Sequence, residues 1–222
     1  MKLRITGAGL ALTMLTTANG PALAGASQQP GNLSEAAASA PQDTPALEAK
    51  AQFVPADFDV PTSVEANGFK LVPLGPALVK IDFDAYMSSI EHLQKTFSRS
   101  TAWPHPDISD ADAMLDMETE QGRFEQRTSF AYAVLTPDGL RERGCVYVYP
   151  SPVKGYDAMV RMWVTEAEYD AGFETELYNW VTQWIQKDWP FDTVAYPGHS
   201  VDWATWDDLV AAKKAGELPP EA

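Results

Sequence analysis

The distribution of aromatic residues sets the strongest limit on what this chain can fold into. Its 7 Trp, 8 Tyr and 9 Phe residues all lie after residue 52. The segment 25–52 is rich in Ala, Ser, Pro and Gln, so it cannot bury enough apolar surface to offset the entropy lost on ordering. We therefore expect a disordered linker at 25–52, one domain with an aromatic core at 53–216, and a disordered tail at 217–222.

The first residues have the pattern of a secretory signal. Lys2 and Arg4 precede an apolar run from Ile5 to about Ala18, and Ala22-Leu23-Ala24 follows as a small-residue cleavage site. The run is too short to span a bilayer comfortably. We expect residues 1–24 to be removed and the mature protein to be periplasmic or secreted, without stable membrane insertion.

The net charge limits the classes of partner. The formal charge is −15, and loss of Lys2 and Arg4 with the signal takes it to −17. Such an acidic protein repels nucleic acid and anionic lipid headgroups, so we expect no nucleic-acid partner. The same charge also serves solubility, and nothing in the sequence indicates an oligomeric state.

Periodicity predicts an α/β layered domain. The clearest element is the hairpin "SFAYAVLTPDGLRERGCVYVYP", whose two β-rich runs join through Pro137-Asp138-Gly139. Asp82 or Asp84 is a candidate cap for the first helix, and Ser109 for the second. The expected order is a strand at 67–73, a helix at 84–97, a helix after Ser109 to about 125, the hairpin at 129–150, a strand at 156–164, a helix at 170–187, a strand at 192–196 and a helix at 203–214.

Two neighbouring strands carry candidate binding residues. Alternation places Asp157, Met159, Arg161 and Trp163 on one face of the strand 156–164, and Cys145, Tyr147 and Tyr149 on one face of the preceding strand. A guanidinium within an apolar strand requires an anion, and Asp157 or a ligand are the candidates. Tyr147, Tyr149 and Arg161 are thus candidate substrate-binding residues, with aromatic core as the alternative for the tyrosines.

The segment "WVTEAEYDAGFETEL" is unusually acidic. Five acids without a Lys or Arg surround an expected strand-to-helix turn: Glu166, Glu168, Asp170, Glu174 and Glu176. Acids in the first turn of a helix stabilise it by roughly 0.3–1 kcal/mol each. We interpret the segment as helix stabilisation.

The sequence gives little support for a disulfide, a metal site or a serine-hydrolase site. Cys145 is the single cysteine, which excludes an internal disulfide, and its apolar neighbours indicate a small buried side chain. His92, His105 and His199 lack metal-ligand spacing, and no EF-hand loop is present, so we expect no metal site. "GHSVD" imitates a serine-hydrolase elbow, but no histidine follows Ser200, which we interpret as the cap of the last helix.

The element order resembles that of the GCN5-related N-acetyltransferase (GNAT) superfamily over about residues 67–198. The resemblance is carried by "FKLVPLGP", "WPHP", "RTSFAYAVL", "GCVYVYP" and "WPFDTVAYPG". It implies a mixed, largely antiparallel sheet flanked by helices. The last strands of the family are missing, since only one helix is expected after the fifth strand.

The resemblance also implies a place for acetyl-CoA as co-substrate. In GNAT enzymes it lies where the fourth and fifth strands diverge, with its pyrophosphate on backbone N–H groups of a turn written Gln/Arg-x-x-Gly-x-Gly/Ala. That turn falls on residues 167–172, where only Gly172 agrees, while Ala167 and Asp170 depart from it. The implied cofactor-binding residues are Trp163, Val164, Asp170, Ala171 and Gly172.

Two hypotheses about function follow. If the domain is an enzyme, the resemblance implies a CoA-dependent N-acyltransferase acting on a small amine, with Asp157 as base and Tyr196 as acid. A carboxylate 6–8 Å from a phosphate charge opposes binding by roughly 2–3 kcal/mol, so the pyrophosphate turn is degenerate. The alternative is a non-catalytic periplasmic module that kept the GNAT architecture and binds a cationic or neutral ligand, or a partner protein.

Overall fold

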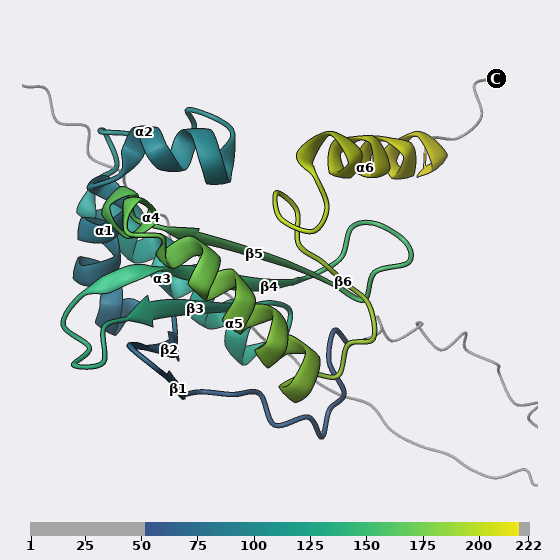
Figure 1. Ribbon diagram of the computed structural model, residues 1–222, viewed down its shortest axis with the longest axis horizontal. Coiled ribbons are helices and arrows are strands. Elements are labelled where there is room, and N and C mark those ends of the chain that lie inside the picture. Colours follow the sequence, from purple (N-terminus) through teal and green to yellow (C-terminus); the bar gives the residue numbers. More distant parts are fainter. Residues whose placement is uncertain (1–51, 218–222) are drawn as a thin grey trace, which may run out of the picture. The chain divides into compact units, whose positions relative to one another are not determined.

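The computed structural model describes residues 52–217, and the expected signal, linker and most of the expected tail lie outside this range. Helices flank one six-stranded sheet (Figure 1). No helix among the described residues is long and apolar enough to cross a bilayer. The elements are β1 (Val64–Ala66), β2 (Phe69–Pro73), α1 (Val79–Met87), α2 (Ile90–Leu93), α3 (Asp110–Glu125), β3 (Phe130–Leu135), β4 (Glu142–Pro150), β5 (Ala158–Val164), α4 (Glu166–Asp170), α5 (Phe173–Asp188), β6 (Val194–Ala195) and α6 (Trp203–Glu217).

The sheet has the order β1-β2-β3-β4-β5-β6. Neighbouring strands are antiparallel from β1 to β5, and only β5 and β6 run parallel. Within residues 52–217 no strand follows β6. The mixed, largely antiparallel sheet with flanking helices is therefore the fold class expected from the sequence.

The predicted hairpin is present as β3 and β4. Its turn is closed by the amide of Thr136, which donates to the carbonyl of Arg141 at 2.8 Å, and Gly139 supplies the positive φ of 75°. Strand β1 was not expected. It pairs with β2 through the two-residue turn Asn67-Gly68, where Gly68 has φ 86°.

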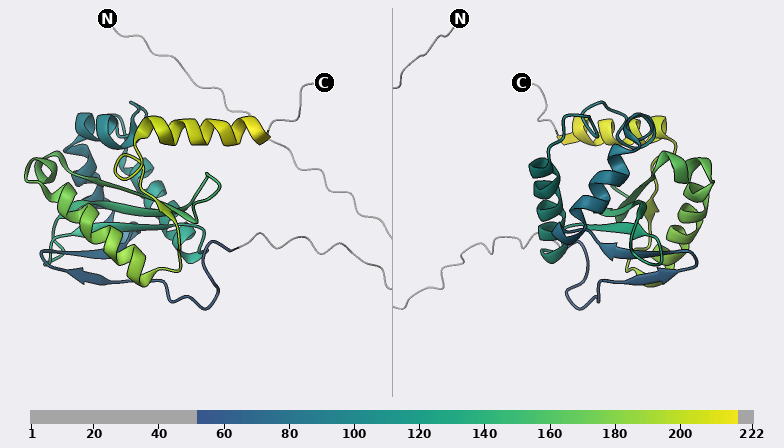
Figure 2. Two further views of the ribbon diagram at one scale, coloured as in Figure 1. Left: turned by 45° about the vertical axis from the view of Figure 1, so that its right-hand side comes forward. Right: turned by 90° about the vertical axis from the view of Figure 1, so that its left-hand side faces the viewer.

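Both faces of the sheet are covered (Figure 2). On one face, alternate residues of β3 such as Phe130 and Tyr132 pack with Leu177 and Trp184 of α5. The other face packs beneath α1 and α3, with Ala133 among its residues. Because neither face meets water, every residue of β3 is buried and the strand is apolar throughout.

The expected helix at 84–97 is three pieces instead of one. Helix α1 already begins at Val79, and the non-helical backbone of Ser89 separates it from α2, which continues as a π-helix over Gln94–Ser98. Asp82 and Asp84 are not caps, since both lie inside α1. The cap of α3 is confirmed: Ser109 and Asp112 exchange reciprocal hydrogen bonds with each other's backbone.

The C-terminal elements also differ from expectation. The helix expected at 170–187 begins at Phe173 as α5, and Gly172, with φ 82°, separates it from the short helix α4, which was not expected. The cap of α6 is Asp202 rather than Ser200, because the amide of Thr205 donates to Asp202 Oδ1 at 3.0 Å. Strand β6 is only two residues long.

Candidate functional site

Strands β5 and β6 diverge soon after they pair. The only paired residues are Ala158 with Val194 and Met159 with Ala195, so β5 from Val160 onward has no strand partner on this side. This is the opening where the GNAT resemblance places acetyl-CoA. The space that remains there is about 40 Å³, roughly the room of one or two water molecules.

The chain itself fills the opening. Residues 196–201 form a compact turn, in which the amide of Gly198 donates to the carbonyl of Val201 at 2.8 Å. Gly198 has φ 86°, and a Cβ there would lie 2.7 Å from Nε1 of Trp203. The indole thus packs directly on the glycine backbone, and His199 stacks on Tyr178 of α5 at 4.5 Å. The opening is closed by the molecule's own side chains.

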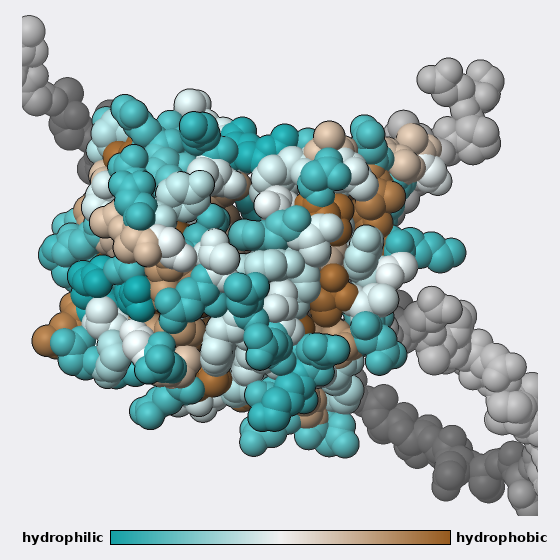
Figure 3. Space-filling view, viewed as in Figure 1, coloured by the Kyte–Doolittle hydropathy of each residue, from teal (hydrophilic) through white to brown (hydrophobic). Residues whose placement is uncertain are grey.

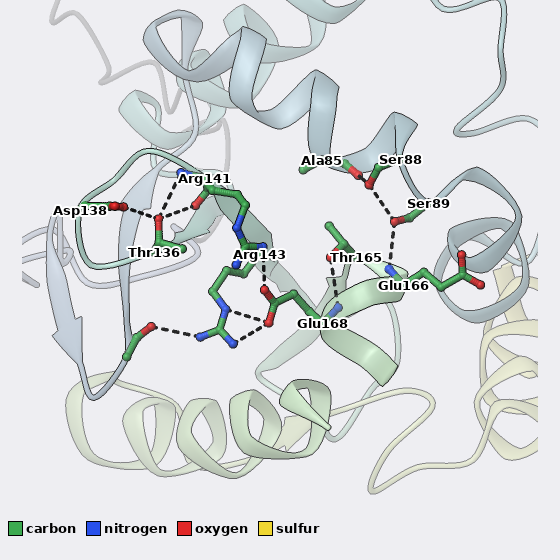
Figure 4. A network of polar contacts seen from close by, with 11 residues as sticks. Ala85, Ser88, Ser89, Thr136, Asp138, Arg141, Arg143, Thr165, Glu166 and Glu168 are labelled. Carbon is green, nitrogen blue, oxygen red and sulfur yellow. Dashed lines mark hydrogen bonds and ion pairs between the residues drawn. The ribbon is translucent and has the colours of Figure 1, made fainter. Parts of the chain in front are cut away.

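The acidic segment after β5 contains a buried ion pair (Figure 4). Glu168 is 6% exposed, and its carboxylate contacts Arg143 at 2.6 Å and Arg141 at 2.7 Å. Burial alone would raise the pKa of Glu168, but hydrogen bonds from Arg143 and Arg141 outweigh it and hold the pKa below its ordinary value. The counter-ions that the segment lacks come from the β3–β4 hairpin.

The amides expected to hold a pyrophosphate already have partners. The amides of Ala171 and Gly172 donate to carbonyls of α4, and the amide of Glu166, just before the expected turn, donates to Ser89 Oγ at 2.9 Å (Figure 4). No atom lies within 4 Å of where a Cβ on Gly172 would be, so its positive φ, rather than a tight cradle, requires glycine. Asp170 is exposed at the end of α4.

The other two expected cofactor-binding residues are part of the core. Trp163 is 2% exposed and Val164 is 1% exposed. The five residues therefore form no free anion-binding turn within the described chain.

The structure gives the expected catalytic pair other roles. Asp157 Oδ2 accepts from the amides of Asp192 and Thr193 at 2.9 and 2.8 Å, which ties the start of β5 to the segment before β6. The hydrogen bond from the Thr193 amide lowers the pKa of Asp157, and this makes it a weaker base. Tyr196 is buried against Tyr178 on the α5 side, and burial raises its pKa. No contact joins Asp157 and Tyr196 among residues 52–217.

The expected binding residues do share one face of the sheet. The register pairs Tyr147 with Arg161 and Tyr149 with Met159. The two tyrosine rings stack at 5.7 Å, and Trp163 Nε1 donates to the Tyr147 hydroxyl at 3.2 Å. The tyrosines form a partly buried aromatic layer, and the alternation argument for this face is confirmed.

Arg161 has no acidic partner. Its guanidinium donates to the carbonyl of Phe97 and lies 4.2 Å from that ring and 5.4 Å from the ring of Trp203. Within residues 52–217 no carboxylate lies within ion-pair distance of it. The expected partner Asp157 is occupied by Thr193. Burial lowers the pKa of Arg161, yet a guanidinium keeps its charge at neutral pH.

Arg161 borders an open pocket of about 500 Å³, which we call the arginine pocket. Its charged residues are three cations and one acid, Arg99, Arg161, Lys214 and Asp207. Arg99 makes two hydrogen bonds to Asp207, at 3.0 and 2.8 Å, and lies 4.6 Å above the ring of Trp203. The apolar walls include Met159, Trp203 and Trp206, and apolar residues gather below α6 in Figure 3.

The comparisons with known proteins give distant structural likenesses. No protein-family model matches the chain, and no curated protein matches it significantly. A solved structure described as a GNAT-family acetyltransferase from Bordetella pertussis has 16% identity and a TM-score of 0.43, covering 57% of this chain and 73% of that one. A chain described as a ribosomal-protein-serine acetyltransferase from Vibrio cholerae has 10% identity and a TM-score of 0.44, covering 56% and 67%.

A third similar structure is spermidine N-acetyltransferase from Vibrio cholerae in complex with CoA and spermine. It has 11% identity and a TM-score of 0.39, and the match covers 54% of this chain and 64% of that one. At such identities and TM-scores the likeness carries no conclusion about activity, and the fold class rests on the sheet itself.

The arginine pocket has the chemistry of a binding site. A guanidinium presents a planar fork that matches carboxylate or phosphate oxygens, and the indole rings offer flat apolar surface. Its lining contains no His, Cys or Glu, and its one acid is held by Arg99. The pocket can therefore hold an anion.

Sequence reasoning identified Arg161 but missed most of the pocket. Arg99, Trp203, Trp206 and Lys214 come from the segment after α2 and from α6, which meet β5 only in the folded chain. The positive φ of Arg99, 54°, has no clear signature in the sequence. The clustering of Trp203 and Trp206 at the start of the last helix was the one available signal.

Proposed function

We propose that this GNAT-like domain is a non-catalytic binding module whose ligand is a small anion with an aromatic or apolar body, held in the arginine pocket. The observation that carries the proposal is the guanidinium of Arg161, which borders a pocket of about 500 Å³ without a carboxylate partner in the described chain. A partly buried cation of this kind gains most from an anion that binds with it.

The charge of the pocket changes the class of ligand. The module hypothesis from the sequence expected a cationic or neutral ligand because the whole chain is acidic. Arg99, Arg161 and Lys214 outnumber Asp207 locally, so the field inside the pocket favours anions. A carboxylate matches the fork of Arg161, and an apolar ring or short chain matches the apolar walls of the pocket.

A CoA-dependent N-acyltransferase acting on a small amine is the second candidate. The GNAT-like sheet and the unpaired edge of β5 favour it. Acetyl-CoA would have to displace the turn 196–201 and Trp203, and its pyrophosphate would meet amides that already have partners. These two requirements place the transferase second.

The localisation is also part of the proposal. We place the mature module in the periplasm or outside the cell, because the segment 1–24 has the basic, apolar and small-residue regions of a signal. N-terminal sequencing of the chain recovered from the periplasmic fraction checks this. A new N-terminus near Gly25 supports export, whereas an uncleaved chain in the cytoplasm contradicts it.

The ligand class is tested by calorimetric titration of the mature chain with aryl and alkyl carboxylates and with their neutral amides. We expect carboxylates to bind and amides to fail. In Arg161→Gln the dissociation constant should rise by roughly 10- to 100-fold, the usual weight of a charge-assisted hydrogen bond. Arg161→Lys should restore only part of the affinity, because an ammonium cannot bind in a bidentate way.

Lys187→Gln is the matched control, because it removes one positive charge from an exposed position on α5 outside the pocket. It should leave the affinity unchanged. Equal binding of carboxylate and amide, or equal loss in both variants, contradicts the proposal. A large rise in melting temperature with acetyl-CoA would favour the transferase instead.

A further inference from the structure

Three side chains with metal-binding chemistry meet on the opposite side of the core from α5. Asp82 of α1 and Glu142 and Cys145 of β4 place one ligand atom each within 4.8 Å of the others. Cys145 Sγ lies 2.9 Å from Glu142 Oε1 and 3.7 Å from Asp82 Oδ1. Cys145 is buried as the sequence indicated, but its sulfur contacts carboxyl groups rather than apolar atoms alone.

The cluster is almost completely shielded from water. The exposed fractions are 4% for Asp82, 1% for Glu142 and 0% for Cys145. No basic residue among those described forms an ion pair with either carboxyl group. Asp116 adds further negative charge near Asp82. Two acids and a thiol are thus buried together without a cation.

One oxygen of the cluster has no hydrogen-bond partner among residues 52–217. Glu142 Oε2 is buried and accepts no hydrogen bond. Leaving a buried polar atom unsatisfied costs about 1–3 kcal/mol, and more when the group is charged. A cation held by both oxygens of this carboxyl group would supply the missing partner for Oε2 and the missing countercharge for the cluster.

We propose that Asp82, Glu142 and Cys145 form a buried binding site for one divalent transition-metal ion, with Zn²⁺ as the best fit. A sulfur ligand disfavours Ca²⁺ and Mg²⁺, which take oxygen ligands, whereas Zn²⁺ accepts thiolate and carboxylate together. Three protein ligands leave the fourth tetrahedral position open.

The geometry requires only a small adjustment. Sulfur and oxygen ligands of tetrahedral Zn²⁺ lie roughly 3.5 Å apart, so Cys145 Sγ and Glu142 Oε1 must separate by roughly 0.6 Å. The Glu142 side chain can rotate by this amount, whereas the strand backbone holds Cys145 in register with Trp163. The ion replaces the thiol proton and any proton on the two carboxyl groups, so binding releases protons without change of oxidation state.

Burial is consistent with this exchange. It raises the pKa of Asp82 to about 7 and raises the pKa values of Glu142 and Cys145 well above their ordinary values. A proton-sharing cluster that binds no metal is the competing description.

The experiment uses the mature full-length chain, purified without a histidine tag. Its zinc content is measured by elemental mass spectrometry, and the chelator-treated protein is then titrated with Co²⁺. We expect one zinc per chain, and with Co²⁺ a thiolate charge-transfer band in the near ultraviolet together with the visible bands of tetrahedral cobalt. Proton release on binding, followed with a pH indicator, should accompany both metals.

Matched variants on one helix separate the ligand from its surroundings. Asp82→Asn should weaken Zn²⁺ binding by more than roughly tenfold, whereas Asp84→Asn, an exposed residue two positions further, should leave it unchanged. Cys145→Ser should remove the charge-transfer band. Circular dichroism establishes that each variant folds.

The wild-type chain alone can overturn the proposal. No stoichiometric zinc and no thiolate band with Co²⁺ would show the proton-sharing cluster instead, whatever the variants do. A band that persists in Cys145→Ser would place the metal elsewhere. Neither result concerns the arginine pocket, whose ligand is tested separately.

Discussion

At the scale of single residues, Glu168 shows how a segment full of acids becomes part of a stable structure. Glu166 and Glu168 lie in the first turn of α4, and Glu174 and Glu176 in the first turn of α5, where the helix dipole favours them. Glu168 alone is buried, and it alone of the four has arginine partners. Four of the five acids therefore lie where the helix-stabilising interpretation places them, and Glu168 adds a tertiary ion pair. Asp170 does not fit the interpretation, because it is the last residue of α4.

Replacing this carboxylate should destabilise the fold in a pH-dependent way. We expect Glu168→Gln to lower the free energy of unfolding by about 2–3 kcal/mol at neutral pH, because Arg143 loses its buried partner. The folded-state pKa of Glu168 lies below its ordinary value of 4.5, so the ion pair's contribution is complete above that pH and disappears as the pH falls through the folded-state value.

Urea unfolding of the wild type and Glu168→Gln at pH 7 and at pH 3 checks this. The difference between the two proteins should shrink at the lower pH. Glu166→Gln is the control, since this neighbour is exposed and has no ion pair among the described contacts. If the two proteins differ in free energy of unfolding by the same amount at both pH values, the packing of Glu168 rather than its charge stabilises the fold.

At the scale of elements, strands β4 and β5 approach unusually closely at Gly144. A Cβ on this residue would lie 2.0 Å from the carbonyl oxygen of Trp163 and 2.8 Å from the Cα of Val164. These contacts are with backbone atoms of β5, which cannot move aside as the end of a flexible side chain can. Glycine at this position therefore fixes the spacing of the strand that carries Arg161.

The same substitution should have opposite effects at two glycines. Gly144→Ala should destabilise the domain by about 1–3 kcal/mol through overpacking against β5. Gly122→Ala, inside α3 with nothing closer than 3.8 Å, should stabilise it by up to about 1 kcal/mol, because alanine suits a helix better. Thermal unfolding of both variants measures the signs, and a neutral Gly144→Ala would refute the close approach.

Elements fixed by local chemistry were predictable, and those fixed by distant contacts were not. The β3–β4 hairpin follows from its turn residues, and α3 from Ser109 and its reciprocal bond with Asp112. The break between α1 and α2 depends on Ser89, whose hydroxyl binds the amide of Glu166, 77 positions away. Sequence periodicity reports only neighbouring residues, so it cannot predict a contact between segments this far apart.

At the scale of the whole molecule, the two candidate sites differ in what could be inferred. Arg161 followed from alternation, because a charge within an apolar strand is visible in the sequence. Asp82 was, like Asp84, only a candidate helix cap in the sequence, because its burial beside Glu142 and Cys145 depends on the packing of α1 against β4. The residues of a site that is assembled from distant segments form no local pattern in the sequence, so the site cannot be predicted from it.

The position of Trp203 has one more consequence. Its indole closes the gap between β5 and β6 by resting on Gly198, and the same ring forms a wall of the arginine pocket through its contacts with Arg99 and Arg161. A molecule that entered the gap would have to swing this ring away and so dismantle the wall. A molecule in the gap between β5 and β6 and a ligand in the arginine pocket would therefore exclude each other. The rotamer of Trp203 determines which of the two can bind.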